Sequence, residues 1–97
     1  MPKIESEPVA LTEFALAVFV YCSIFDGSVT SWIRSKKRNA ALGGVPHSGH
    51  VVGLGCDVVY DVVPPEDERR AWAGRLGLLL VIEGDHDHLQ PATWRAG

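Results

Sequence analysis

The clearest pattern near the start of the chain is a helical one. Apolar side chains recur every three or four positions from residue 11 to residue 25, which predicts an α-helix. Its apolar face is formed by Leu11, Phe14, Ala15, Val18, Cys22 and Phe25. Further apolar residues lie on the opposite side, so we expect a helix that is buried on most of its surface. The pair Asp26-Gly27 favours a turn and ends the helix.

Two short segments predict strands. Residues 28–33 are rich in β-branched and aromatic side chains, which are typical of strands. Residues 53–63 predict a second strand, because their side chains alternate in character. This alternation places on one face the side chains of Cys56, Val58, Tyr60 and Val62. Asp57 then lies on the other face, and Cys56 is expected to point into the core rather than toward a ligand.

Helices are expected between the strands. Ser35 is a suitable N-cap for a short helix over residues 36–42. Pro65 suits the first position of another helix, and the acidic residues 66–68 suit the positive end of its dipole. Gly77 is expected to close this second helix.

The second half of the chain predicts the inward side of the second helix and then the rest of the sheet. Trp72 and Leu76 are four residues apart and are expected to pack inward. Residues 78–82 form a nearly continuous apolar run, which predicts a central strand. Residues 83–90 are expected to turn and begin a last strand.

The chain predicts one small α+β domain over residues 1–97, with helices packed on an antiparallel sheet. Residues 1–8 are expected to be a loose N-terminus and residues 91–97 a C-terminal tail. Cys22 and Cys56 are too few for a disulfide framework, and the sequence leaves a bridge between them open.

Charge and hydropathy limit the kinds of partner that the chain is expected to bind. The formal net charge is −3, and the one basic cluster, residues 36–38, is short, so we expect no nucleic acid partner. The apolar run over residues 9–25 is shorter than the roughly 20 residues that cross a bilayer, and Glu13 interrupts it. It also lacks a preceding basic region, so we expect neither a signal peptide nor membrane insertion.

Histidine and acidic residues concentrate in two segments. The first runs from Ser48 to Asp57 and contains His50, and the second is Asp85-His86-Asp87-His88. His50, Asp57 and one of the late histidines can supply three zinc ligands and leave a fourth position open. Open sites with mixed histidine and carboxylate ligands are typical of catalytic zinc, whereas structural zinc prefers a closed, cysteine-rich shell. The sequence therefore predicts one zinc ion.

The order of these residues resembles a known family. The matching elements are Thr30-Ser31-Trp32-Ile33-Arg34-Ser35, Asn39, Gly43-Gly44-Val45-Pro46, Ser48-x-His50-x-x-Gly53, Asp57 and a later acid three residues before a histidine. Together they are similar to the zinc D-alanyl-D-alanine carboxypeptidases and L-alanyl-D-glutamate endopeptidases, often called LAS peptidases, which include bacteriophage endolysins. Two departures are Gly55, where the family usually has alanine, and Trp32-Ile33, which replaces the usual Gly-Tyr.

The resemblance implies an LAS/Hedgehog-like zinc peptidase fold. It also implies hydrolysis of peptidoglycan stem peptides next to a D-amino acid, with water activated by zinc as the nucleophile. The ligands it implies are His50, Asp57 and His88. Two imidazoles and one carboxylate keep the metal a Lewis acid and lower the pKa of a bound water to about 7.

The resemblance also assigns the remaining site residues. Asp85 would transfer the proton from water to the leaving amine. Arg34 would bind substrate and stabilise the oxyanion of the tetrahedral intermediate. Ser48 and Asn39 match positions that support the site or the substrate.

The late motif fits the family in two registers. Asp85-x-x-His88 and Glu83-x-x-His86 both have the required spacing. We favour the first, because the family's ligand histidine is typically followed by an apolar and then a polar residue, as in His88-Leu89-Gln90. His86 is then expected beside the ligands or in contact with substrate.

Two classes of function follow. The first is a monomeric peptidoglycan hydrolase, made in the cytoplasm and acting on the cell wall in bacteriophage lysis or as a tail-associated virion part. The alternative is a non-catalytic, zinc-stabilised module that binds cell-wall peptides or belongs to a phage tail. Arg34 and Asp85 argue against this alternative, because metal binding alone needs neither.

Overall fold

The structure is a computed structural model that describes residues 11–32, 41 and 53–93. Within these residues it gives the full bounds of two helices and four strands, which confirms the expected α+β class. In chain order they are α1 (Leu11–Phe25), β1 (Gly27–Ser31), β2 (Cys56–Tyr60), α4 (Glu66–Arg75), β3 (Leu78–Ile82) and β4 (Asp87–Pro91). The strands form one antiparallel sheet in the order β1-β2-β4-β3.

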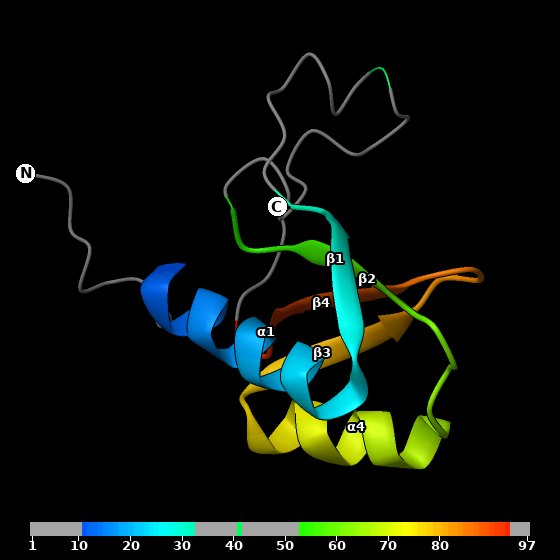
Figure 1. Ribbon diagram of the computed structural model, residues 1–97. Coiled ribbons are helices and arrows are strands. Elements are labelled where there is room, and N and C mark those ends of the chain that lie inside the picture. The colour runs from blue at the N-terminus through cyan, green and yellow to red at the C-terminus, as the bar shows by residue number, and fades with distance from the viewer. Residues whose placement is uncertain (1–10, 33–40, 42–52, 94–97) are drawn as a thin grey trace, which may run out of the picture.

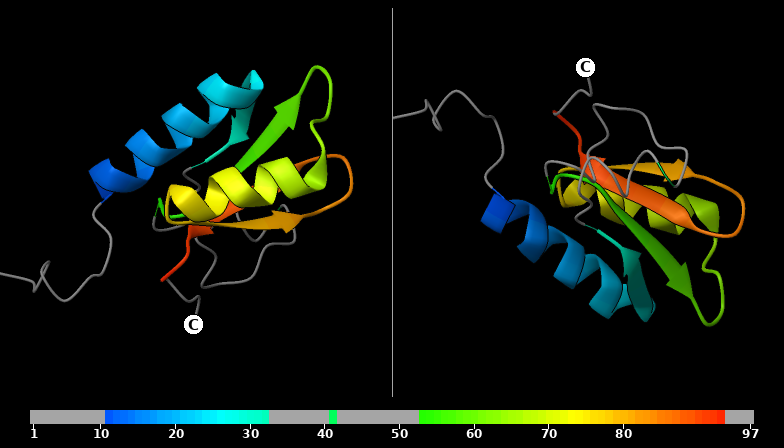
Figure 2. Two further views of the ribbon diagram at one scale, coloured as in Figure 1. Left: turned by 90° about the horizontal axis from the view of Figure 1, so that it is seen from below. Right: turned by 90° about the horizontal axis from the view of Figure 1, so that it is seen from above.

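Both helices lie against the same side of the sheet (Figures 1 and 2). We call this side the helix face and the opposite side the far face. Because side chains alternate along a strand, each strand contributes to both faces. The helix face carries the buried side chains of Cys56, Val58, Leu78, Leu80, Asp87 and Leu89. The far face carries Asp57, Leu79, Val81, His88 and Gln90.

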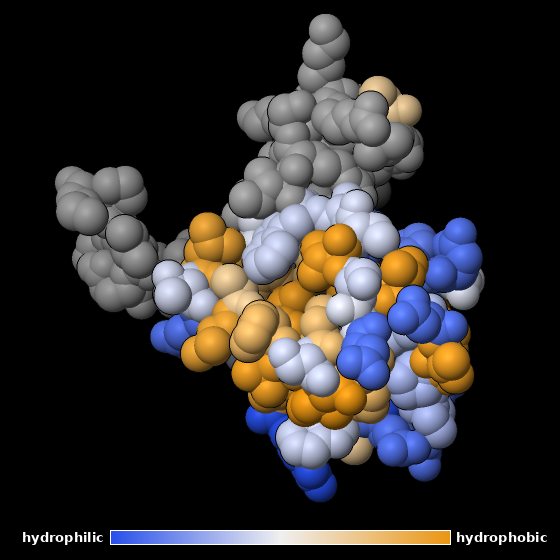
Figure 3. Space-filling model, in the orientation of Figure 1, coloured by the Kyte–Doolittle hydropathy of each residue, from blue (hydrophilic) through white to orange (hydrophobic). Residues whose placement is uncertain are grey.

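Helix α1 confirms the predicted helix but not its predicted burial. Phe14, Val18 and Tyr21 are buried against the sheet. Leu16 and Phe19 point away from it and are 63% and 68% exposed. The reason is that the sheet covers one side of α1 only, and Figure 3 shows hydrophobic side chains gathered at the surface where α1 lies in Figure 1.

Strand β1 begins one residue before the segment 28–33 that was predicted as a strand and ends within it, and β2 occupies the middle of the segment 53–63. β1 begins directly after Asp26, whose φ is 52°, and a Cβ at Gly27 would lie 2.8 Å from Val58 Cγ1. This close approach requires glycine at the turn. Cys56 lies in the core, as predicted. Val62 does not, because β2 ends at Tyr60, and Val62 is 83% exposed.

Helix α4 has the predicted place and end. Pro65 is its N-cap residue rather than its first helical residue. Glu66 and its acidic neighbours occupy the first turn, as the helix dipole favours. Gly77 follows the C-cap with φ of 73°, a conformation that glycine adopts without strain.

The inward side of α4 differs from the prediction. Its buried residues are Arg69 and Ala73. Leu76 packs against the core as expected. Trp72 does not reach the core, and its ring lies 4.8 Å from the Arg75 guanidinium carbon. The spacing therefore predicted the burial of Leu76 correctly but not that of Trp72. The charged side chain of Arg69, one turn before Trp72, is buried instead, because it pairs with Asp87.

Strand β3 was expected to be central and instead lies at the edge of the sheet that the described strands form. Its apolar run is only half buried, because helices cover one face of the sheet: Leu80 is 4% exposed and Leu79 is 40% exposed. Arg70 lies beside this edge, and its Nη1 donates a hydrogen bond to the Leu80 carbonyl at 3.2 Å.

Strand β4 is central and follows the predicted turn. It runs through Pro91, which is fully buried and pairs with Leu78. The chain therefore stays in the sheet at the point where a tail over 91–97 was expected to begin.

Other sequence predictions lie outside the described residues. They are the loose segment 1–8, the helix over 36–42, apart from Ala41, and residues 94–97. Cys22 and Cys56 are free thiols. Neither α1 nor α4 is long and apolar enough to cross a membrane, and no other described helix is.

Candidate metal centre

Asp57 and His88 lie opposite each other at the centre of the far face. They are cross-strand partners in the β2–β4 ladder. Asp57 Oδ1 lies 3.4 Å from His88 Nδ1, and each side chain is 13% exposed. The pair is set by strand geometry, because antiparallel register places directly opposed side chains on the same face.

A second contact orients the imidazole of His88. Its Nε2 lies 2.9 Å from Oε1 of Gln90, two residues along the same strand. Nδ1 is also within hydrogen-bond range of the Asp57 carboxylate, and in the neutral tautomer that donates from Nε2 to Gln90, Nδ1 is the nitrogen that could bind a metal ion. Histidine ligands of metals are commonly held in this way, by a hydrogen bond from the other ring nitrogen.

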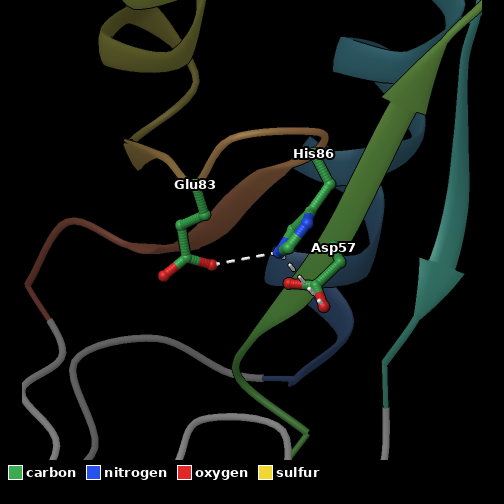
Figure 4. Close-up of side chains that lie close together, drawn as sticks. All are labelled: Asp57, Glu83 and His86. Carbon is green, nitrogen blue, oxygen red and sulfur yellow. Dashed lines mark ion pairs between the residues drawn. The ribbon is translucent and has the colours of Figure 1, made fainter.

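A second imidazole reaches Asp57 from the turn that precedes β4. His86 Nε2 lies 3.9 Å from Asp57 Oδ2 and 3.3 Å from Glu83 Oε1. Ligand atoms of Asp57, Glu83 and His86 all lie within 4.8 Å of one another, so these three residues could hold a metal ion. Figure 4 shows the imidazole of His86 pointing toward both carboxylates.

The turn itself brings Glu83 and His86 together. Glu83 N donates to the His86 carbonyl at 3.0 Å, and Gly84 between them has φ of 81°. A side chain at residue 84 would be strained in this conformation, so glycine permits the tight reversal. The two side chains that leave the ends of this turn then lie beside each other and beside Asp57.

Asp85 lies at the outer side of the same turn. Its carboxylate is 95% exposed, and its Oδ1 lies 2.8 Å from His86 Nδ1. This hydrogen bond raises the pKa of His86, while partial burial opposes the rise and the charges of Asp57 and Glu83 add to it. The same hydrogen bond lowers the pKa of Asp85. Since a metal ion competes with the imidazole proton, metal binding at His86 would release that proton.

The separations suit the ligand shell of a small cation. Two ligand atoms of tetrahedral zinc, each about 2.0–2.1 Å from the metal, lie about 3.3–3.4 Å apart. The Asp57–His88 pair is 3.4 Å apart and the Glu83–His86 pair is 3.3 Å apart. The wider Asp57–His86 separation of 3.9 Å would need a small adjustment.

The described residues contain part of the predicted site. Asp57, predicted as a zinc ligand with one of the late histidines, lies beside both of them, at 3.9 Å from His86 and 3.4 Å from His88, and Glu83 lies beside His86. Asp85 contacts His86 at the surface. The other predicted site residues, which lie outside the described residues, are Arg34, Asn39, Ser48 and His50.

Two contributions were missed from sequence. Gln90 orients His88, and the alternation His86-x-His88-x-Gln90 could have indicated this, because residues two apart share a face. Asp87 was assigned no role from the sequence, yet it is 3% exposed and bonded to Arg69 and Tyr60. Tyr60, placed by alternation on the same face as Cys56, donates one of these bonds.

No protein-family model matches the chain. No curated protein and no solved structure matches it either. Family and function are therefore inferred from this chain's own residues.

Proposed function

We propose that the chain is a zinc-dependent peptidase that cleaves peptidoglycan stem peptides next to a D-amino acid, by D-Ala-D-Ala carboxypeptidase or L-Ala-D-Glu endopeptidase action. The observation that carries the proposal is the position of Asp57. Its carboxylate lies between two imidazoles, those of His88 at 3.4 Å and His86 at 3.9 Å, with Glu83 beside them. The motif order links this centre to peptidoglycan hydrolases.

The donor set supports zinc in a catalytic role. It contains imidazole nitrogens and carboxylate oxygens, both of which zinc accepts. Cys56, the thiol nearest in sequence, is fully buried on the helix face and points away from Asp57. A centre without thiolates, on a partly exposed face, fits an open catalytic site better than a closed structural one.

We assign the metal to Asp57, His88 and His50. Strand geometry supports the first two, since sites built on strands hold their geometry better than sites on turns. In this register Asp85 takes up and returns the proton, and Arg34, Ser48 and Asn39 bind the substrate and its developing charge. Zinc, when bound, lowers the pKa of a water molecule to about 7 and polarises the scissile carbonyl.

The motif Glu83-x-x-His86 is the alternative to Asp85-x-x-His88 within the same function. There His86 is the ligand and Glu83 moves the proton. The contacts that support it are the 3.3 Å approach of Glu83 to His86 and the Asp85 hydrogen bond to the other ring nitrogen. This bond is of the type that orients metal-binding histidines.

A digest read by mass spectrometry tests the function. The zinc-loaded protein is incubated with purified peptidoglycan and with defined stem peptides, beside Asp85→Asn and Glu83→Gln variants. Asp61→Asn serves as a matched control, because Asp61 is an exposed carboxylate in the bend after β2. We expect new fragments from the wild type and from the control, and their masses identify the bond that is cut.

The two acid variants distinguish the two motifs, and the wild type tests whether the protein is an enzyme. Loss of fragments in Asp85→Asn alone supports the motif Asp85-x-x-His88. Loss in Glu83→Gln alone supports the motif Glu83-x-x-His86. No fragments from any protein, with one zinc bound per chain, would replace the enzyme by a non-catalytic module that binds cell-wall peptides or belongs to a phage tail. We further propose that the enzyme is a monomer that acts on the cell wall in bacteriophage lysis or from the virion.

A further inference from the structure

Strand β4 presents different chemistry on its two faces. Asp87 points to the helix face, where it is 3% exposed, while its neighbours His86 and His88 both contact Asp57 on the other side. Asp87 is therefore a buried charge placed directly between the two histidines of the candidate metal centre. A buried carboxylate is costly unless it is paired and hydrogen-bonded, so its partners need an explanation.

The partners of Asp87 come from two other elements. Arg69 Nη1 of α4 donates to Asp87 Oδ2 at 2.5 Å, and the Tyr60 hydroxyl of β2 donates to the same oxygen at 2.7 Å. Arg69 Nε also donates to the Pro64 carbonyl at 2.8 Å. Tyr21 of α1 lies one step further out, with its hydroxyl 2.7 Å from that of Tyr60.

Stability alone does not account for this network. Replacing a buried ion pair by apolar side chains of similar volume is often neutral or stabilising, because desolvation offsets the attraction between the charges. What a buried polar pair can add is a definite geometry. Here the geometry concerns β2 and β4, since Tyr60 and Asp87 belong to the two strands that carry Asp57 and His88.

The register of these strands decides whether the metal centre exists. The ladder pairs Asp57 with His88 and Val58 with Asp87. A slip of one residue would turn His88 into the core and Asp87 to the far face, because side chains alternate. A slip of two residues would keep the faces but separate Asp57 from His88. Either slip would move Asp87 away from the Tyr60 hydroxyl and from Arg69.

We propose that the Arg69–Asp87–Tyr60 network is a positioning device that locks the β2–β4 register and thereby holds His86 and His88 against Asp57 for metal binding. This inference rests on the proposed zinc centre and assigns positioning roles to three residues that do not touch the metal. Metal ligands must be placed within a few tenths of an ångström, so a loosened strand lowers metal affinity before it unfolds the protein.

Two phenylalanine variants test the inference. Tyr60→Phe keeps the ring and removes the hydroxyl that bonds Asp87, whereas Tyr21→Phe removes a buried hydroxyl one step away and leaves the Tyr60–Asp87 bond. Zinc affinity is measured by competition with a chromophoric chelator, and the visible absorption of bound Co²⁺ reports ligand geometry. Circular dichroism and urea unfolding of the metal-free proteins establish that each variant is folded.

We expect zinc affinity to fall about tenfold in Tyr60→Phe, with a changed Co²⁺ spectrum, and less than about twofold in Tyr21→Phe. An Arg69→Met/Asp87→Leu double variant, which replaces the ion pair by apolar side chains, should fold and show the same loss. A folded Tyr60→Phe or double variant with wild-type zinc affinity would overturn the inference, as would equal losses in the two phenylalanine variants. Absence of zinc binding by the wild type would instead overturn the proposed function, and the inference with it.

Discussion

Asp57 and His88 face each other across β2 and β4, with Oδ1 of the carboxylate 3.4 Å from Nδ1 of the imidazole. The pair is held by the ladder and by Gln90 before any metal arrives. Little side-chain ordering is then left to accompany metal binding, and ordering of this kind is a main cost of association. The metal-binding predictions follow from this preorganised pair.

Substituting the shared carboxylate should weaken metal binding most. Asp57 contributes an oxygen to each of the two imidazole contacts, so Asp57→Asn removes a charged ligand from both registers. We expect zinc affinity to fall by at least about 100-fold, since even residues that only support ligands typically contribute 10- to 100-fold. Competition with a chromophoric chelator measures the change.

The matched control for this substitution is Asp61→Asn. It makes the same chemical change four residues away at an exposed position. Its zinc affinity should stay within about twofold of the wild type, because a solvated charge outside the ligand shell contributes little. Equal losses in Asp57→Asn and Asp61→Asn would mean that general charge, rather than ligation, determines binding.

The two histidines should differ in their contribution. His88→Gln removes the ligand held on a strand, and we expect zinc affinity to fall about 100-fold. His86→Gln removes an imidazole held on a turn, and we expect a loss below about tenfold. Isothermal titration with zinc on both variants measures the difference. The reverse order would identify Glu83-x-x-His86 as the functional motif.

Alkaline pH should destabilise the fold through its buried phenols. Burial raises the pKa of Tyr21 from 10.0 to about 12, although its hydrogen bond with Tyr60 partly lowers it. In the unfolded chain the phenol ionises near its ordinary pKa, while in the folded chain it keeps its proton. The stabilisation is therefore complete below about pH 10 and is lost as the pH rises toward about 12.

Urea unfolding followed by circular dichroism at about pH 8, 10 and 11 measures this loss. Tyr21→Phe removes one titrating group, so its midpoint should decline less steeply over the same range. A variant that declines as steeply as the wild type would show that Tyr21 does not contribute to the transition. Tyr60 and Cys56 should keep part of the decline, because burial raises the pKa of each.

Adjacent leucines of β3 should differ in their effect on stability. Leu80 faces the helices and is 4% exposed, whereas Leu79 faces away and is 40% exposed. Leu80→Ala should lower the free energy of unfolding by about 2–4 kcal/mol, since it leaves a cavity. Leu79→Ala should cost less than about 1 kcal/mol. Chemical denaturation of the two variants checks the alternation directly, and similar losses would place both side chains in the core.

Local pattern predicted most of the secondary structure. Helix α1, a strand within residues 53–63 and the turn that follows β3 all follow from residue spacing and turn chemistry. Pattern did not predict which face would be covered or which strand would be central. The apolar run of β3 is equally compatible with a central strand and with an edge strand, because sheet order depends on contacts between distant segments.

The candidate site was predicted more completely than its supports. Asp57 and the late histidines could be named because zinc chemistry restricts the ligands and the family resemblance fixes their order. Arg69 and Asp87 could not be paired from sequence, because a charged residue in a polar segment is usually solvated. Only the fold shows that these two residues, 18 positions apart in the chain, meet in the core.

The place of β4 in the sheet has a consequence for how the protein is made. β4 lies between β2 and β3, yet it follows both in the chain. Among the strands that the structure describes, β3 pairs with β4 alone, so during synthesis it lacks this partner until residues 87–91 have left the ribosome, while β2 has β1. The same five residues bring His88 opposite Asp57. Completion of this sheet and assembly of the candidate metal centre are therefore one event, so a chain that ends before β4 would lack the Asp57–His88 pair.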